Sequence, residues 1–299
     1  MTTADRLARY TALHSGTDGL HETEVDALGL IRADRPSHPV HTVYEPTVCV
    51  VFQGAKQVTV GETVLEYGPG DHLVVGLDIP VVGRVTEASP EAPYLAVQVR
   101  LDPGLLADVA RDAGVTVDPT DQDGAALRAF VAPLGRPAAE ALDRLVGLLD
   151  TPRAIPALYP AVARELYYWL LVGPGGDAFA RATLPGGHAA QIAEAVRQMQ
   201  EAFPGPIRVG DLAESAGMSE SSFYTHFQSV TGMPPLQYYK RLRLLEARRL
   251  LAAEGASARG AAFAVGYESP SQFGREYKRL FGAPPIRDAA RLRTRRERV

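Results

Sequence analysis

The sequence is 299 residues long, 46% of them hydrophobic, with one cysteine and a formal net charge of −4. This is the composition of a soluble globular protein with room for two domains; it excludes an internal disulfide and a cysteine-based zinc site, and no apolar run reaches the roughly 18 residues that span a membrane. From Ala189 to the end 17 basic residues outnumber 11 acidic ones, whereas the preceding part holds 14 and 24, so only the C-terminal part suits a polyphosphate partner.

Residues 1 to about 27 mix Thr, Asp, Glu and Gly with scattered leucines. We expect a short helix and an arm here. The first five residues open no signal peptide, which predicts a cytoplasmic location.

The next segment, from Leu28 to Leu101, consists of β-branched runs separated by turn residues every eight to twelve positions. Gly61-Glu62 is typical of a tight hairpin, and residues 68–71 form a turn by composition. Short strands at this spacing predict an antiparallel barrel or sandwich. The predicted strands are Leu28–Ala33, Val40–Tyr44, Val48–Phe52, Lys56–Val60, Glu62–Tyr67, His72–Gly76, Val81–Thr86 and Tyr94–Leu101.

Residues 104–172 are helical by period. Leu142, Leu145 and Leu149 lie on one stripe, and Val162–Leu171 is a second apolar helix, so both are expected to pack on the barrel. Two glycine- and proline-rich runs then bracket a linker. The sequence thus predicts an N-terminal domain over 1–172 (barrel about 28–101, helices about 104–172), a linker over 173–188 and a C-terminal domain over 189–299.

The C-terminal part contains one helical unit twice. Leu212–Phe227 and Ala261–Tyr277 align with one inserted residue, Glu268, and a Gly-x-Pro-Pro sequence follows each copy. Each copy reads as a short helix closed by a glycine, a tight turn and a second helix. This pattern is typical of a helix-turn-helix unit, whose second helix lies in the DNA major groove; the alternative is a pair of ordinary helical hairpins.

Caps and aromatic residues define the second helix of each unit. Ser219 and Ser269 are placed to cap it, and Gln272, three residues after the second serine, predicts a capping box. The inward aromatic pairs are Phe223 with Phe227 and Phe273 with Tyr277. The polar residues that then face outward are Ser221, Tyr224, Thr225 and Gln228 in the first unit and Ser271, Gly274, Arg275 and Lys278 in the second.

A single long helix joins the two units. Leu236–Ala253 lacks Gly and Pro, and at about 1.5 Å per residue it spans roughly 27 Å. With the bodies of the units added, this helix could hold the two reading helices about 34 Å apart, one turn of DNA. One chain could then read two successive major grooves.

Val209–Arg293 resembles the DNA-binding domain of the AraC/XylS family of bacterial transcription regulators, which has two helix-turn-helix units joined by a long helix. The resemblance rests on Leu212-Ala213, Gly217-Met218-Ser219, Phe223, Phe227, Thr231-Gly232, Pro234, Arg243-Leu244, Ala247, Leu250-Leu251, Ala264-Val265-Gly266-Tyr267, Ser269, Gln272-Phe273, Lys278, Phe281-Gly282 and Pro284.

The resemblance implies which outward residues contact DNA. Base-reading positions are occupied by Ser221, Tyr224 and Thr225 in the first unit and by Gln272, Gly274 and Arg275 in the second. Arg275 is the best candidate, because a guanidinium can grip guanine at two atoms. The cations Lys278, Arg279, Arg241 and Arg243 are interpreted as clamps on the DNA backbone or as a solvated face, and the basic residues 291–296 as a source of unspecific attraction.

The strand-rich part resembles the cupin-like N-terminal domain of one branch of these regulators. The matching runs are Tyr44–Lys56, Tyr67–Val74, Asp78–Val81, Pro93–Ala96 and Leu101–Pro103. Metal-binding cupins present a His-x-His pair that this chain lacks, since His38 and His41 are three apart and His72 stands alone, so neither metal nor cofactor is expected. The barrel is interpreted as a pocket for a small organic effector.

Four residues are candidates for the effector pocket. Gln98 and Arg100 share the polar face of a strand, with solvent exposure as the alternative. His72 follows a Gly-Asp turn. Cys49 lies in an apolar strand, where a buried structural thiol is the default and an electrophile or redox sensor is the alternative.

The overall prediction is a multidomain protein with a cupin-like antiparallel barrel and flanking helices, followed by an all-α domain of two helix-turn-helix units. Its predicted function is a ligand-responsive, DNA-binding transcription regulator; the resemblance implies an activator and a homodimer formed by a helix after the barrel, and RNA polymerase is left open as a partner. The alternatives are a ligand-independent architectural DNA-binding protein and a cupin enzyme. No Gly-x-Ser-x-Gly sequence or glycine-rich phosphate loop supports an enzyme.

Overall fold

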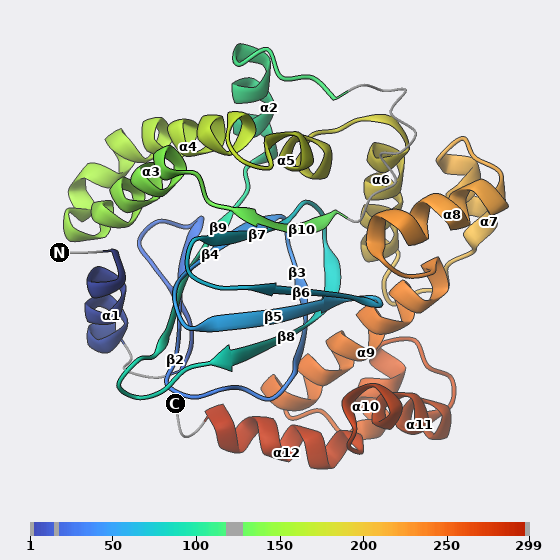
Figure 1. The fold of residues 1–299 in the computed structure, drawn as a ribbon. Helices are drawn as coiled ribbons and strands as arrows, with labels where there is room; N and C mark the ends of the chain where they lie inside the picture. The colour runs from blue at the N-terminus through green and yellow to red at the C-terminus, as the bar shows by residue number, and fades with distance from the viewer. Residues whose placement is uncertain (1–2, 15–17, 118–127, 297–299) are drawn as a thin grey trace.

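The computed structural model describes residues 3–14, 18–117 and 128–296. It contains two antiparallel sheets, a layer of helices over the larger sheet, and a set of C-terminal helices (Figure 1). The described strands are β1 (Gly19–Glu22), β2 (Leu28–Ala33), β3 (Val40–Tyr44), β4 (Thr47–Gln53), β5 (Ala55–Val60), β6 (Thr63–Tyr67), β7 (Asp71–Val75), β8 (Ile79–Glu87), β9 (Tyr94–Arg100) and β10 (Ala129–Pro133).

The strands form a six-stranded sheet in the order β1-β2-β9-β4-β7-β10 and a four-stranded sheet in the order β3-β8-β5-β6. All eight predicted strands are present as β2 to β9, with ends that agree within two residues. The antiparallel cupin-like architecture predicted from the sequence is therefore confirmed.

Two strands were not predicted. Strand β10 lies within residues 104–172, so the expectation that this whole segment is helical is wrong. β10 is a five-residue strand that pairs with β7, from Ala129 opposite Val75 to Pro133 opposite Asp71. Strand β1 likewise pairs with β2 at the other edge of the sheet. Both are short strands at the edges of the sheet. The partner of β10 is distant in the sequence, and the few residues of β1 show little alternation of polar and apolar side chains, so periodicity along the chain does not reveal either strand.

The larger sheet is buried on both faces. Alternate residues such as Val48 and Val50 of β4 pack against the helical layer, which includes Leu142 and Leu145, whereas Cys49 and its neighbours face the space between the sheets. The helices of the N-terminal part are α1 (Thr3–His14), α2 (Pro103–Asp112), α3 (Arg136–Gly147), α4 (Ile155–Val172) and α5 (Gly176–Thr183). Helix α5 occupies residues expected to form the linker, and its Phe179 is fully buried in the core of the N-terminal part.

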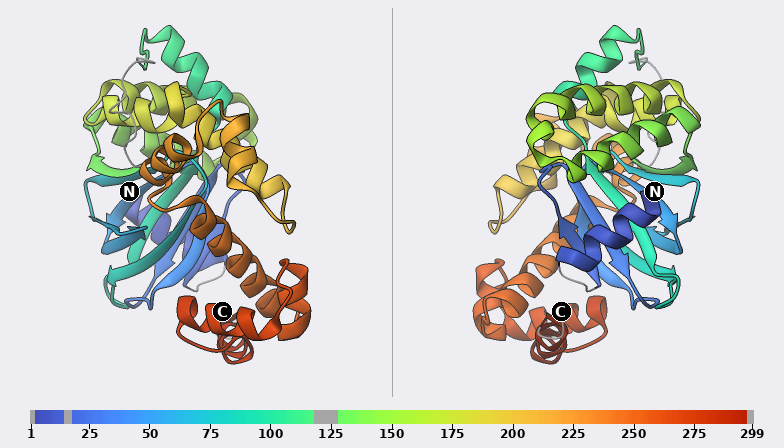
Figure 2. Two further views of the ribbon diagram at one scale, coloured as in Figure 1. Left: turned by 90° about the vertical axis from the view of Figure 1, so that its right-hand side faces the viewer. Right: turned by 90° about the vertical axis from the view of Figure 1, so that its left-hand side faces the viewer.

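The C-terminal helices run along one side of the sheets, from the helical layer to the opposite end (Figure 2). They are α6 (Gly187–Glu201), α7 (Val209–Ser215), α8 (Glu220–Thr231), α9 (Pro235–Ala253), α10 (Ala258–Ala264), α11 (Pro270–Phe281) and α12 (Pro285–Arg296). Both predicted helix-turn-helix units are present as α7–α8 and α10–α11, and α9 is the predicted long helix. Among the described residues, no helix is both long and apolar enough for a membrane span.

The turns of the two units form as the sequence predicts. Gly217 and Gly266 have φ angles of 66° and 78°, a left-handed conformation that glycine adopts without steric cost. The hydroxyl oxygens of Ser219 and Ser269 each accept a backbone N–H of the next helix at 3.3 Å. The side-chain half of the capping box is different, because the Gln272 amide donates along the helix to Glu276 at 3.3 Å.

Candidate nucleic-acid interface

Helix α8 presents a polar face to solvent and an aromatic face to the core. Phe223 and Phe227 are fully buried, with ring centroids 5.5 Å apart. This anchoring fixes the rotation of α8 and leaves the opposite face free of intramolecular packing. The exposed residues of that face are Ser221, Tyr224, Thr225 and Gln228.

Helix α11 repeats this arrangement at the equivalent positions. Phe273 and Tyr277 are buried with ring centroids 5.4 Å apart. Gly274 is half-buried, and a Cβ atom added to it would meet no atom within 4 Å. The backbone of α11 is therefore accessible to close approach at this point. The exposed residues of this face are Ser271, Gln272, Arg275 and Lys278.

Glu276 connects α11 to its surroundings. Its carboxylate accepts hydrogen bonds from the Tyr267 hydroxyl at 2.8 Å and from the Lys240 ammonium of α9 at 3.0 Å, in addition to the Gln272 amide. These contacts orient both α11 and the Gln272 side chain. The sequence analysis did not single out Glu276, although its spacing of four residues from Gln272 on a helix is a detectable signal.

The four cations predicted as backbone clamps fall into two groups. Lys278 and Arg279 are exposed on α11, in agreement with a role at the phosphates or on a solvated face. Arg241 and Arg243 are half-buried on α9. Arg243 instead donates to the Val265 carbonyl, and its guanidinium lies 4.6 Å from the centre of the Tyr267 ring. Arg243 is therefore part of the packing between α9 and the second unit.

The four effector candidates do not meet in one place. Cys49 and Gln98 are directly opposite each other on β4 and β9 and face the space between the sheets. His72, opposite Val50, points to the other face, where its ring contacts Phe130 edge-on at 6.4 Å. Arg100 is exposed at the end of β9 and donates to the Asp26 carbonyl. Strand alternation separates only His72 from the others, because Cys49, Gln98 and Arg100 share one face of the sheet. Gln98 and Arg100 also line one small hollow of about 240 Å³ at the end of β9.

Burial controls the ionisation of the two buried candidates. Cys49 is 2% exposed, and burial raises the pKa of its thiol, which disfavours the reactive thiolate. His72 is also 2% exposed, and burial lowers the pKa of its imidazole to about 4, so the ring is neutral at pH 7. Burial thus favours a protonated thiol at Cys49 and a neutral ring at His72.

A polar cluster between the sheets was missed by the sequence analysis. Lys56 is only 9% exposed, and its ammonium lies 5.5 Å from the centre of the Tyr44 ring. Tyr67 and Tyr94, 3% and 0% exposed, are buried in the same core. The signal was strand parity, because Lys56 shares its face of β5 with the buried Val58 and Val60.

In the part of the chain that the structure describes, no group of three or more His, Cys, Asp or Glu side chains is arranged to hold a metal ion.

Comparisons with known proteins match two regions of the chain. Residues 24–178 match the family model described as AraC-type transcriptional regulator N-terminus, and residues 212–291 match a helix-turn-helix domain. The chain is 38% identical over 77 residues to a Streptomyces lividans protein described as an AraC-like transcription regulator, covering 26% of this chain and 25% of that protein. It is 29% identical over 149 residues to the transcriptional activator RhaS of Pectobacterium atrosepticum, covering 49% of this chain and 51% of RhaS.

These matches span a quarter to a half of the length of the relatives. Among solved structures, unsaturated fatty acid bound ToxT from Vibrio cholerae superposes with a TM-score of 0.55 over 88% of this chain and 94% of ToxT. The sequence identity of that pair is 8%, so this similarity concerns the fold. With more than half of the chain matched by the N-terminal family model and a helix-turn-helix model on the remainder, the protein belongs to the AraC/XylS family of bacterial transcription regulators.

Proposed function

We propose that the protein reads a specific DNA sequence by laying α8 and α11 in two successive major grooves, and that a small organic effector bound by the N-terminal domain controls this reading. The observation that carries the proposal is the repeated amphipathic arrangement of α8 and α11, with matching buried aromatics and exposed polar faces at equivalent positions. Polar faces anchored in this way suit direct readout of base edges.

Each exposed residue has a proposed role. The Arg275 guanidinium reads a guanine, and Ser221, Tyr224, Thr225 and Gln272 contribute further contacts with the bases. Gln228, Ser271 and Lys278 position the helices on the phosphate backbone.

The regulatory role is proposed to be activation. RhaS, which matches half of this chain, is named a transcriptional activator. An activator needs a surface that contacts RNA polymerase in addition to one that contacts DNA. The family resemblance also supports a homodimer formed through the helices after the barrel. Leu158, Tyr168 and Val172 of α4 are large apolar side chains exposed to solvent, which supports such a subunit contact.

Effector control is supported by the ToxT structure with a bound unsaturated fatty acid, because this fold holds an organic molecule there. The second candidate is a ligand-independent architectural protein. The dense packing between the sheets favours it, since Val58, Val60, Leu73 and Tyr94 are fully buried. An effector site outside the barrel interior reconciles this packing with ligand control.

Selection of DNA bound by the protein from a random pool tests the proposal. We expect two short blocks about 10 base pairs apart, one for each reading helix. Binding without sequence preference and with steep salt dependence would support the architectural candidate instead. The selection is repeated with Arg275→Ala, which should lose information at one position of one block.

A further inference from the structure

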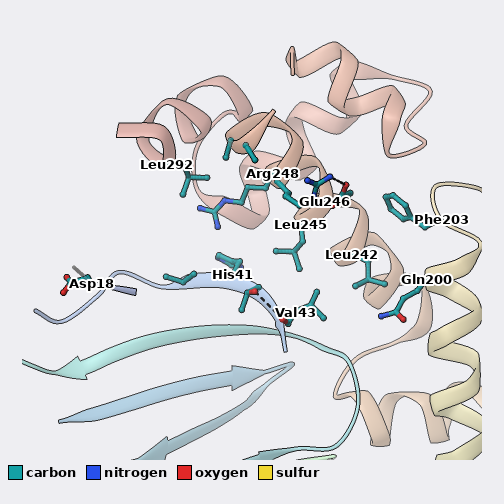
Figure 3. A pocket seen from close by; sticks show the side chains of 15 residues that line it. Asp18, His41, Val43, Gln200, Phe203, Leu242, Leu245, Glu246, Arg248 and Leu292 are labelled. Carbon is teal, nitrogen blue, oxygen red and sulfur yellow. Dashed lines mark hydrogen bonds and ion pairs between the residues drawn. The ribbon is translucent and has the colours of Figure 1, made fainter. Parts of the chain in front are cut away.

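A groove separates the N-terminal sheets from the helix that joins the two reading units. It has a volume of about 790 Å³ and lies between β3 on one side and α9 with the end of α12 on the other (Figure 3). Figure 3 shows Leu242 and Leu245 of α9 facing Val43 and His41 of β3 across this space. Sites for small molecules commonly have this size and occur where domains meet.

The walls of the groove are mainly apolar and incompletely covered. Leu242, Leu245 and Val43 are half-buried, and Val40 is 45% exposed. Helix α9 has two apolar sides: Leu244, Ala247 and Leu251 are buried in the core of the second unit, while Leu242 and Leu245 face the groove. Apolar surface of this kind is stabilised by covering it with an apolar ligand.

The two arginines that line the groove are already paired with carboxylates, and the Asp18 carboxylate there accepts the Asp34 backbone N–H at 2.6 Å. Arg248 binds the Asp288 carboxylate at 2.8 Å, and Arg249 binds Glu246 at 2.8 Å and Glu254 at 3.1 Å. Because these carboxylates neutralise the arginines, the groove offers an anionic ligand little counter-charge, and a buried carboxylate without a partner is costly.

One of the remaining polar groups, the imidazole of His41, can orient a ligand. His41 lies among Phe281, Arg241, Arg248 and Asp288, and burial lowers the pKa of its imidazole to about 4, so the ring is neutral at pH 7. A neutral imidazole has one donor and one acceptor nitrogen. The neighbouring Thr42 hydroxyl instead donates to the Val43 carbonyl at 3.4 Å. The His41 ring suits one hydroxyl or carbonyl group on an otherwise apolar molecule.

We propose that this groove is the effector site and that the effector is an uncharged, mainly apolar molecule with one or two hydrogen-bonding groups. The proposal rests on the proposed control of DNA reading by a small organic effector. The walls of the groove belong to the N-terminal sheets and to α9, the helix that carries the second reading unit. A ligand that prefers one spacing of β3 and α9 therefore shifts the placement of α11. The ligand thereby acts between the domains, outside the densely packed barrel.

Binding of the uncharged dye Nile red to the full-length protein tests the site without DNA. We expect its fluorescence to rise on binding, and Leu245→Gln and, on the opposite wall, Val43→Gln each to weaken binding about tenfold. The matched control is Leu236→Gln, on the same helix but 58% exposed and outside the groove; it should leave binding unchanged. Circular dichroism identifies the variants that fold, and unchanged dye binding in a folded groove variant would overturn the assignment.

Competition between 1-octanol and octanoate at pH 8 tests the chemical class. These probes share a chain and differ in charge, so we expect octanol to displace the dye at a concentration at least about tenfold lower. Equal or stronger displacement by octanoate would refute an uncharged effector. The affinity for DNA is measured separately with and without octanol. If the dye binds in the groove but octanol leaves the affinity for DNA unchanged, the groove is a ligand site and effector control of DNA reading is rejected. The two measurements therefore distinguish failure of the site from failure of the proposed function.

Discussion

The two helix-turn-helix units are copies in sequence but have different tertiary surroundings. In the first unit, Phe223, Phe227 and Met233 belong to a core that continues into the space between the sheets, with Cys49 and Leu73. In the second unit, Phe273 and Tyr277 belong to a separate core built from residues of α9 to α12. The first unit is therefore packed as a part of the N-terminal structure, and the second is largely self-contained.

Hydrogen bonds reinforce the difference. The Tyr238 hydroxyl at the start of α9 donates to the Asp78 carbonyl at 2.6 Å, the Gln200 amide donates to the Asp78 carboxylate at 2.9 Å, and the Arg128 amide donates to the Val230 carbonyl at 3.1 Å. The second unit meets β3 through the His41–Phe281 ring contact, at 5.1 Å, beside the groove. A movable second unit on a fixed first unit would let a ligand change DNA reading without unfolding a core.

Truncation of equivalent core rings should give the largest difference in behaviour between the two units. Phe227→Ala and Phe273→Ala remove equivalent buried rings, and each should cost about 3–5 kcal/mol of folding free energy. The one tryptophan, Trp169, lies in α4 of the N-terminal part. We expect Phe227→Ala to shift the denaturation transition followed by Trp169 fluorescence, and Phe273→Ala to affect mainly the helical signal. Equal shifts of the fluorescence transition would contradict two separate cores.

Glycine substitutions test the contact between the barrel and the first unit. Gly61, at the tip of the β5–β6 hairpin, has φ of 59°, and a Cβ there would lie 1.9 Å from the Gly232 carbonyl oxygen at the end of α8. Gly70 has φ of 93° and no atom within 4 Å of such a Cβ. Gly70→Ala should cost about 1 kcal/mol of backbone strain, and Gly61→Ala about 1–3 kcal/mol more, from overpacking. Thermal denaturation of both variants measures this difference.

Arginine and lysine on α11 should differ in what they contribute to DNA binding. Arg275→Ala should weaken binding to the selected operator by about 1–3 kcal/mol and relax preference at one base position. Lys278→Ala should lower affinity for all sequences alike and reduce the salt dependence. Titrations with operators altered base by base compare the two; an Arg275→Ala variant with wild-type affinity and preference would refute the assigned reading face of α11.

Acid should loosen the second unit through His41, with the smallest expected effect. The pKa of His41 is lowered to about 4 by burial and by the neighbouring Arg248 and Arg241, against an ordinary value of 6.5. Between these values the unfolded chain binds a proton that the folded contact excludes, so stability from this contact is present above pH 6.5 and lost as pH falls toward 4.

Hydrogen exchange of α11, corrected for intrinsic rates, measures the effect of acid at pH 7 and pH 5. We expect faster exchange at pH 5 in the wild type and a smaller change in His41→Gln, whose side chain does not titrate in this range. The first unit contains its own histidine with a lowered pKa, His226, stacked on His188 at 4.1 Å. The informative quantity is therefore the difference between the wild type and His41→Gln in how much exchange of α11 speeds up at pH 5. If exchange speeds up equally in the two proteins, His41 is excluded as the cause.

The sequence by itself determined the local structure of this protein. Glycine positions, serine caps and aromatic spacing define both helix-turn-helix units, and alternation defines β2 to β9, because these features depend on residues a few positions apart. The exposed faces of α8 and α11 follow from the same spacing, so the candidate DNA-contact residues could be named before the structure.

Tertiary structure decided which copy of the repeat joins the barrel and where a groove remains. Gly61 meets Gly232 and Tyr238 meets Asp78 across more than 150 residues of chain in each case. The contact of Lys56 with Tyr44, the contact of His72 with Phe130 and the pairing of β10 likewise depend on strands brought together from distant positions. Local periodicity carries no information about such contacts, because they are set by how sheets and helices pack and not by the order of neighbouring residues.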